Sequence, residues 1–222
     1  MLDRHSTNEG RPKGDAYSRA MRIHLVRHGR PAIDTSAPAK EWGLDANAGP
    51  DVYRLRDSGV LPREAAWFTS SERKAVETAA RLLTGAVTEL DGIREAERSA
   101  LWLRGDEFEA AVRRSFQRPD QPAVPGWEPL TATRTRVVDA VRSTLAAVTQ
   151  RAAALDVVFV GHGTAWTVLV AELTAAPADL DAWATMSMPD HCSLDLNGSD
   201  PDCVTAEVAS GWGTWTDPST PA

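Results

Sequence analysis

Apolar residues in this chain often stand in short continuous or alternating runs, the pattern of β-strands. The clearest run, at residues 156–160, contains four consecutive apolar residues, three of them β-branched. Such a strand is typical of a sheet covered on both faces. A second run begins at residue 22 and ends in Arg27 and His28. Further strands are predicted at 65–69, 87–90, 193–196 and 204–208, the last two as an antiparallel hairpin across the turn at 197–201.

Between these strands, apolar residues recur every three or four positions, which predicts amphipathic helices. The helix predicted at 72–84 follows Ser70 and Ser71, which are typical N-cap residues, and stops before Gly85. Prolines indicate loops over 30–50 and 118–129. Further helices are predicted at 51–58, 105–117, 131–153 and 165–174.

Strands that alternate with helices predict an α/β fold. We expect a three-layer α/β/α sandwich with a mostly parallel sheet and one late antiparallel hairpin or edge strand. The chain contains no internal repeat, and its length suits a single domain. We assign residues 21–210 to that domain, residues 1–20 to a flexible extension and residues 211–222 to an unstructured tail.

Composition narrows the classes of function. A net charge of -7 over 222 residues argues against a nucleic-acid partner, which requires a basic surface. No run approaches the roughly 20 apolar residues of a membrane span, and the polar first 20 residues carry no export signal. We therefore expect a cytoplasmic protein with Cys192 and Cys203 as free thiols. A homodimer is compatible with the sequence.

Two predicted strands end in the same chemistry. One finishes in Arg27, His28 and Gly29, and the other in Gly161, His162 and Gly163. Parallel strands bring their carboxyl ends to one edge of a sheet, where ligands bind, so the two imidazoles should meet there. The segment 70–74 adds hydroxyls, a helix N-terminus and cations. These groups together suit a tetrahedral oxyanion such as phosphate, with no metal or other cofactor.

At these motifs the chain resembles the histidine phosphatase superfamily (phosphoglycerate mutase-like), over about residues 22–196. The resemblance implies that His28 is a nucleophile that becomes phosphohistidine. It also implies that Arg27 and His162 hold the phosphate, and that Glu95 protonates the leaving group. The glycines after the histidines, Gly29 and Gly163, join the predicted substrate-binding residues.

The sequence departs from the family pattern in the helix at 72–84. Where the family usually has an arginine before an alanine, this chain has Lys74, and Arg73 stands one position earlier. Our hypothesis gives the phosphate-binding role to Lys74, with Arg73 as the alternative. Glu97 is likewise an alternative to Glu95 as the acid, and either acid needs a raised pKa to donate a proton near neutral pH.

The resemblance favours a metal-independent phosphomonoester hydrolase that acts through phosphohistidine on a small phosphorylated metabolite. The alternatives are a phosphoglycerate-type mutase and a non-catalytic module that binds a phosphorylated ligand. A mutase needs extra cations for a second phosphate. A metal site built on two histidines lacks an obvious third ligand. The arginines available for a second phosphate are Arg94, Arg98, Arg104, Arg113 and Arg114.

Eight tryptophans are many for a chain of this length. Trp67 and Trp166 stand in apolar segments and are expected in the core. Trp42, Trp102 and Trp127 stand in predicted loops, so they either pin those loops or line a substrate entrance that favours an apolar or aromatic group. Four other polar residues carry weaker hypotheses: His5 in the flexible extension, His191 at the pocket rim, and Arg136 with Glu128 as a surface ion pair or as part of the site.

Overall fold

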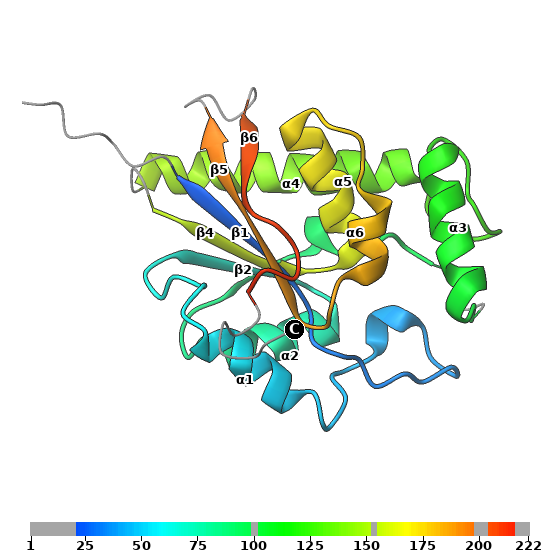
Figure 1. Ribbon diagram of the computed structural model, residues 1–222, viewed down its shortest axis with the longest axis horizontal. Coiled ribbons are helices and arrows are strands. Elements are labelled where there is room, and N and C mark those ends of the chain that lie inside the picture. Colours follow the sequence, from blue (N-terminus) through cyan, green and yellow to red (C-terminus); the bar gives the residue numbers. More distant parts are fainter. Residues whose placement is uncertain (1–20, 99–101, 152–154, 198–203, 216–222) are drawn as a thin grey trace, which may run out of the picture.

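The strands predicted from the sequence lie in one sheet, in the order β3-β2-β4-β1-β5-β6 (Figure 1). The computed structural model describes residues 21–98, 102–151, 155–197 and 204–215. Neighbouring strands from β3 to β1 are parallel, whereas β5 pairs antiparallel with both β1 and β6. The expected mostly parallel sheet with a late antiparallel hairpin is therefore confirmed. The strands are β1 (Arg22–Arg27), β2 (Ala66–Ser70), β3 (Thr88–Leu90), β4 (Val157–Gly161), β5 (Asp190–Asn197) and β6 (Thr205–Ser210).

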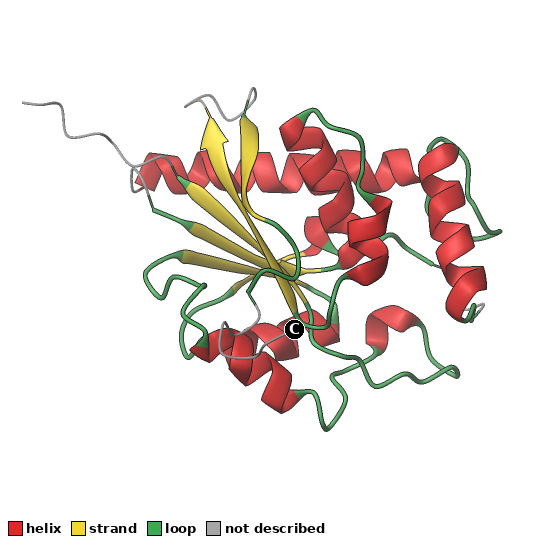
Figure 2. Ribbon diagram, viewed as in Figure 1, coloured by secondary structure: helices red, strands yellow, loops and turns green. Residues whose placement is uncertain are grey.

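Helices cover both faces of the sheet and make the three layers seen in Figure 2. Alternate residues of β1 and β4 point to opposite faces, so each face has its own apolar cluster. One cluster packs under α4 (Leu130–Arg151) and α5 (Gly163–Thr174), and the other under α1 (Gly49–Asp57) and α2 (Arg73–Leu82).

A third, smaller apolar cluster lies beyond the end of the sheet, where Figure 1 shows α3 standing apart. It joins α3 (Gly105–Gln117) to α6 (Leu180–Thr185) through Val112, Trp127 and Trp183. The proline-rich loop before α4 thus closes onto α3 through Trp127. Two single 3-10 turns, η1 (Ala39–Glu41) and η2 (Asp91–Ile93), complete the described elements.

Three local expectations were wrong. The helix expected to be capped by Ser70 or Ser71 has Glu72 at its N-cap, without a side-chain capping bond. The Ser70 hydroxyl contacts His162, and the Ser71 hydroxyl donates to Asp91. Helix α6 was not predicted, although the Asp179 side chain accepts hydrogen bonds from two N–H groups of its first turn. The tail is ordered at least over residues 211–215.

That ordered tail depends on one buried carboxylate. Asp190, 1% exposed, accepts hydrogen bonds from the N–H of Gly213 and the indole of Trp215, each at 2.9 Å. It also accepts from the N–H of Ser187 at 2.9 Å, in the loop that precedes β5. A buried carboxylate needs such partners, so the tail and this loop are fixed together.

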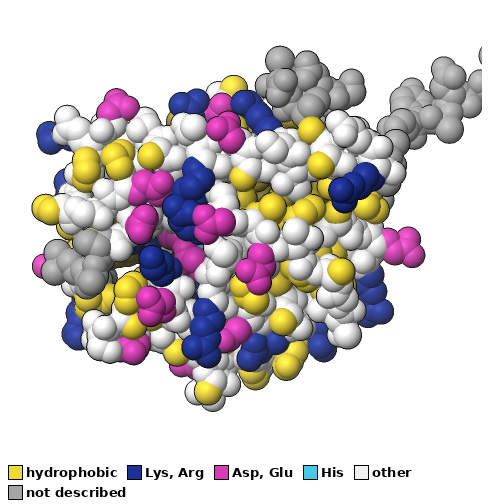
Figure 3. All heavy atoms as spheres, turned by 180° about the vertical axis from the view of Figure 1, so that it is seen from behind, with side chains coloured by type: hydrophobic (Ala, Val, Ile, Leu, Met, Phe, Trp, Pro, Cys, Tyr) yellow, Lys and Arg dark blue, Asp and Glu magenta, His cyan; other side chains and the backbone are white. Residues whose placement is uncertain are grey.

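None of the described helices is long and apolar enough to cross a membrane. On the face shown in Figure 3, acidic and basic side chains are interspersed, without a continuous basic field. This surface agrees with the negative net charge of the chain.

A buried pair of histidines lies outside the candidate site, and one of the two makes stability depend on pH. The imidazoles of His24 on β1 and His191 on β5 stack, with His24 Nδ1 3.0 Å from His191 Nε2. Burial, and then the neighbouring His24, lower the pKa of His191 to about 3. The expectation that His191 approaches the pocket rim is wrong, because it lies 2% exposed inside this pair.

We predict that the protein loses stability as the pH falls from about 6.5 towards 3. The folded-state pKa of His191 lies below its unfolded value of about 6.5, so the neutral imidazole stabilises the fold above that value. The loss on acidification should approach about 1.4 kcal/mol per pH unit for this one group. The free energy of unfolding, measured by urea unfolding at a series of pH values, should depend less steeply on pH in His191→Gln. The difference should correspond to about one proton fewer taken up on unfolding. An unchanged slope would contradict the assignment.

Candidate active site

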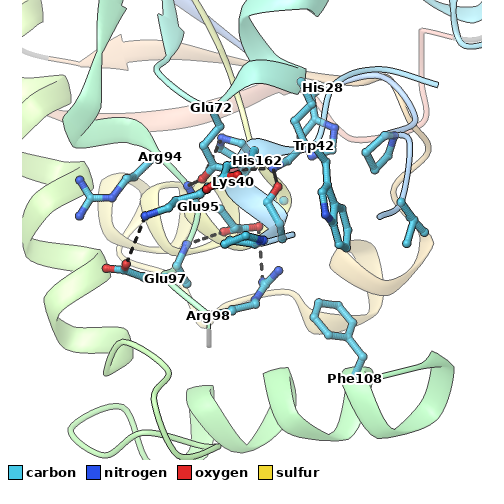
Figure 4. A pocket seen from close by; sticks show the side chains of 18 of the residues that line it. His28, Lys40, Trp42, Glu72, Arg94, Glu95, Glu97, Arg98, Phe108 and His162 are labelled. Atoms are coloured by element: carbon cyan, nitrogen blue, oxygen red, sulfur yellow. Dashed lines mark hydrogen bonds and ion pairs between the residues drawn. The ribbon is translucent and has the colours of Figure 1, made fainter. Parts of the chain in front are cut away.

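The site rests on the pairing of β1 with β4. Arg27 is in register with Gly161, and the His28 N–H donates to the Gly161 carbonyl at 2.9 Å. The residues that follow these two parallel strands therefore leave the sheet side by side. The rings of His28 and His162 meet edge to face, with centroids 5.2 Å apart (Figure 4). The predicted meeting of the two imidazoles is confirmed.

A backbone carbonyl fixes the tautomer of His28. Its Nδ1 lies 2.7 Å from the Gly29 carbonyl oxygen, which can only accept, so Nδ1 carries the proton. Burial lowers the pKa of His28 well below its usual value, and His162, Lys74 and Arg27 lower it further. The ring is therefore neutral near pH 7, with its lone pair on Nε2. This is the form that a nucleophilic imidazole requires.

His162 is completely buried and is held from β2. Its Nε2 lies 2.8 Å from the Ser70 hydroxyl, which also accepts the Glu72 N–H at 3.2 Å. Burial, followed by the charge of Lys74, lowers the pKa of His162 well below its usual value. Its Nδ1 has no hydrogen-bond partner among the described residues. The His162 imidazole is thus a neutral polar group packed beside His28.

Arg27 supplies a fixed cation beside the two rings. Its Nη1 donates to the Met186 carbonyl at 2.6 Å, in the loop that Asp190 holds in place. Its Nε has no partner among the described residues. Gly163 lies against it: a Cβ atom there would stand 3.4 Å from Arg27 Nε. Arg27 and Gly163 both line the cavity described below.

Gly29 has a different role from the one expected. A Cβ atom there would lie 2.8 Å from Val52 Cγ2, and the Gly29 N–H donates to the Thr78 hydroxyl at 3.0 Å. The glycine therefore permits α1 and α2 to approach the end of β1. Gly29 does not line the cavity, so the structure gives it packing contacts.

Of the two candidate cations on α2, Lys74 faces the cavity and Arg73 faces solvent. Arg73 pairs with Glu77 at 2.7 Å, one turn along the same helix, with 68% of its side chain exposed. Lys74 is buried, donates to the Ala39 carbonyl at 2.8 Å and pairs with Glu72. Sequence reasoning missed Glu72, which looked like an ordinary residue at the start of a helix.

Glu95 caps the helix that follows His162. Its carboxylate accepts the N–H groups of Ala165 at 3.1 Å and Thr164 at 3.3 Å, and lies 3.5 Å from Arg98 Nη2. Burial alone would raise the pKa of Glu95, but Arg98, His162 and the Ala96 N–H together hold it below its usual value. The structure therefore does not show the raised pKa that was expected for a proton donor.

Glu97, the alternative acid, lies at the rim. More than half of its side chain is exposed, and it stands 4.0 Å from Lys40 (Figure 4). Glu95 contacts the first turn of α5, directly after His162, so its placement favours it over Glu97.

One cavity of about 870 Å³ joins these groups to a wall of aromatic side chains. In Figure 4, Phe108 lies across the cavity from His28. The guanidinium of Arg98 stacks over Phe108 at 4.7 Å and over Trp127 at 5.3 Å. The cavity is the size of pockets that enclose small organic molecules. The aromatic residues that line it are Trp42, Trp102, Phe108, Trp127 and Trp183.

The three loop tryptophans lie where the sequence left two roles open, and the structure shows their position in the cavity and the loop contacts of Trp42. All three line the cavity. Trp42 also pins its loop, because its indole N–H lies 2.7 Å from the Asp34 carbonyl and 3.1 Å from that of Ala37. Trp102 packs against Trp42 and is 36% exposed, which places it at the mouth.

Comparison with known families agrees with this geometry. The family model of the histidine phosphatase superfamily, branch 1, matches residues 23–208. The chain belongs to this superfamily. No curated protein sequence matches it.

Solved structures of similar fold include several phosphatases. A mycobacterial glucosyl-3-phosphoglycerate phosphatase is 20% identical, with a TM-score of 0.68 over 87% of this chain and 99% of that one. YhfR of Bacillus stearothermophilus is 22% identical, with a TM-score of 0.65 over 86% and 96%. A putative alpha-ribazole-5'-P phosphatase of Escherichia coli is 19% identical, with a TM-score of 0.56 over 86% and 97%. At these identities the likeness shows a common fold.

In this member of the superfamily, Arg136 holds the segment that carries Glu95. Its guanidinium donates to the carbonyls of Gly92 and Arg94 at 2.9 Å and of Glu95 at 3.2 Å, and pairs with Glu128 at 2.7 Å. Neither Arg136 nor Glu128 lines the cavity. The ion pair alternative is therefore the observed one, although the pair is largely buried.

The remaining sequence hypotheses have simple outcomes. Of the five arginines considered for a second phosphate, Arg94 and Arg98 line the cavity. Arg94 pairs with Asp91, and Arg98 with Glu95. His5 and Cys203 lie outside the described residues, and Cys192 is buried and free.

We predict that Lys74→Ala lowers kcat/KM by at least about tenfold for any phosphomonoester that is hydrolysed. The substitution removes one positive charge from the cavity and leaves Glu72 buried without its ion-pair partner. Arg73→Ala is the matched control, because it deletes the charge of the neighbouring residue, which faces solvent. Its kcat/KM should stay within about twofold of the wild type. Steady-state kinetics on folded samples provide the measurement, and equal effects of the two substitutions would contradict the assignment.

Proposed function

We propose that the protein is a metal-independent phosphomonoester hydrolase that acts through a phosphohistidine at His28. The observation that carries the proposal is the state of that imidazole: Nδ1 is committed to the Gly29 carbonyl, and Nε2 keeps its lone pair beside His162 and Arg27. A neutral nucleophile among fixed cations is what phosphoryl transfer to nitrogen needs.

In the first step, His28 Nε2 attacks phosphorus while the bond from phosphorus to the leaving oxygen breaks. Arg27 and Lys74 offset the charge that spreads over the phosphoryl oxygens. The leaving oxygen takes a proton from Glu95, whose pKa rises once a negatively charged phosphoryl group lies nearby. In the second step, water attacks the phosphohistidine, gives its proton back to Glu95, and releases phosphate and free His28.

The cavity favours a hydrolase over a mutase. A mutase must hold a second phosphate, yet the two extra arginines that line the cavity are each paired with a carboxylate. The wall opposite the histidines is aromatic. We therefore propose, as part of this function, that the alcohol portion of the small phosphorylated substrate is apolar or aromatic.

We predict that a labelled phosphoenzyme can be trapped by acid quench from the wild type, and that His28→Ala gives none. His191→Gln, a substitution at a buried histidine outside the cavity, should still give the phosphoenzyme. A protein that binds phosphate esters without forming this intermediate is a binding module. Isomerisation of 3-phosphoglycerate without release of free phosphate would instead identify a mutase.

We predict that the aromatic wall sets substrate preference. Phe108→Ala and Trp102→Ala should each raise KM for 1-naphthyl phosphate by about fivefold, since a lost ring contact is worth about 1 kcal/mol. KM for glycerol 3-phosphate should change less than about twofold. Tyr53→Ala, at an exposed aromatic residue outside the cavity, serves as the control. Equal effects on both substrates would contradict an aromatic-binding role.

A further inference from the structure

The cavity contains a carboxylate that the proposed reaction does not use. Glu72 and Lys74 each have 7% of their side chains exposed, and they form an ion pair inside the site. The other Glu72 oxygen, Oε1, accepts the Glu95 N–H at 2.8 Å and lies 3.7 Å from His162 Nε2. Figure 4 shows Glu72 beside His162.

The Glu72 carboxylate pairs with the Lys74 ammonium, a cation that could otherwise bind phosphate. Lys74 is the cation on α2 that faces the cavity, and its ammonium is held by Glu72 and the Ala39 carbonyl. Glu95 similarly occupies the N-terminus of α5 and lies beside Arg98. Arg27, in contrast, donates to a neutral carbonyl group. Two carboxylates thus already offset two of the three cations nearest the histidines.

A carboxylate discriminates between charge states of a ligand. Ionised Glu72 can only accept hydrogen bonds, and a fully ionised phosphoryl group also offers only acceptors. The two repel at short range in a buried site, where charges are poorly screened. A phosphoryl group that keeps one proton can instead donate it to Glu72.

We propose that Glu72 is a built-in competitor of the phosphoryl group: it pairs with Lys74 and makes the cavity favour the singly charged form of the phosphoryl group over the doubly charged form. This inference rests on the proposed function only for the identity of the ligand. It assigns a specificity-determining role to Glu72, whereas a purely structural Glu72 would keep Lys74 in position for phosphate.

The other titratable groups around Glu72 give the proposal a clear pH window. Lys74 approaches it from α2, Glu95 from the segment after η2, and His162 from the end of β4; His28 and Arg27 face the same cavity from the end of β1. We use the window from about pH 5.5 to 8, in which the protonation of both imidazoles is disfavoured because burial lowers their pKa well below the usual value. A change in phosphate affinity across that window then reports the protonation of phosphate itself, whose second ionisation falls inside it.

Binding of inorganic phosphate, measured by calorimetry at about pH 5.5 and about pH 8 and at constant ionic strength, tests the proposal without turnover. Glu72→Gln keeps the shape of the side chain and an oxygen that can accept the Glu95 N–H. We expect it to bind phosphate about tenfold more tightly than the wild type at pH 8 and within about threefold of it at pH 5.5. Glu97→Gln removes the same charge at the exposed rim, and we expect changes of less than about threefold at both pH values.

The double substitution Glu72→Gln with Lys74→Met separates competition from a structural role and guards against misfolding caused by an unpaired lysine. If the charge of Glu72 offsets that of Lys74, the double variant should bind phosphate with an affinity within about threefold of the wild type. Weaker binding by Glu72→Gln, a gain no larger than that of Glu97→Gln, or a loss of more than tenfold in the double variant would overturn the proposal. Thermal unfolding checks that each variant is folded. Failure to trap a phosphoenzyme would count against the proposed function and leave this result standing.

Discussion

The pairing of β1 with β4 is the constraint on which the rest of the site depends. The His28 N–H extends the parallel ladder by one hydrogen bond, to the Gly161 carbonyl, just before both chains leave the sheet. The two imidazoles therefore stand on neighbouring strand ends, in positions set by backbone hydrogen bonds. A shift of one residue in this register would turn the site residues to the opposite face of the sheet.

The cations at the end of the sheet are partly or fully buried and repel one another, and buried carboxylates offset their charges. Buried charges are costly unless they are paired and hydrogen-bonded. Glu72 forms an ion pair with Lys74, and Glu128 forms one with Arg136. Glu95 pairs with Arg98 and also accepts hydrogen bonds from the N-terminus of α5. These pairs also tie the site together mechanically. Arg136 reaches from α4 to the carbonyls of Gly92, Arg94 and Glu95, so the position of Glu95 depends on a helix that does not line the cavity.

The sequence predicted those parts of the site that follow from local rules. His28 and His162 each stand directly after an apolar run, and strand periodicity with parallel topology brings them to one edge. The choice of Lys74 over Arg73 followed from helix geometry. Glu72 and Arg136 could not be found in this way, because their roles depend on contacts between segments far apart in the chain. The pattern Ser70-Ser71-Glu72 matches an ordinary helix start, and nothing local shows that the Ser70 hydroxyl turns to His162. The same limit explains the ordered tail, where the buried Asp190 binds residues more than 20 positions away.

Trp42 shows that one side chain can both hold a loop in place and line the cavity. The loop between β1 and α1 is long, and side chains as well as its own backbone hydrogen bonds hold it to the protein. Trp42 does this through its indole N–H, and its ring meanwhile faces the cavity beside Trp102. An indole is suited to both tasks because one edge is polar and the faces are apolar. The order of the loop and the apolar lining of the cavity mouth are thus two consequences of the same packing, and a change at Trp42 would alter both together.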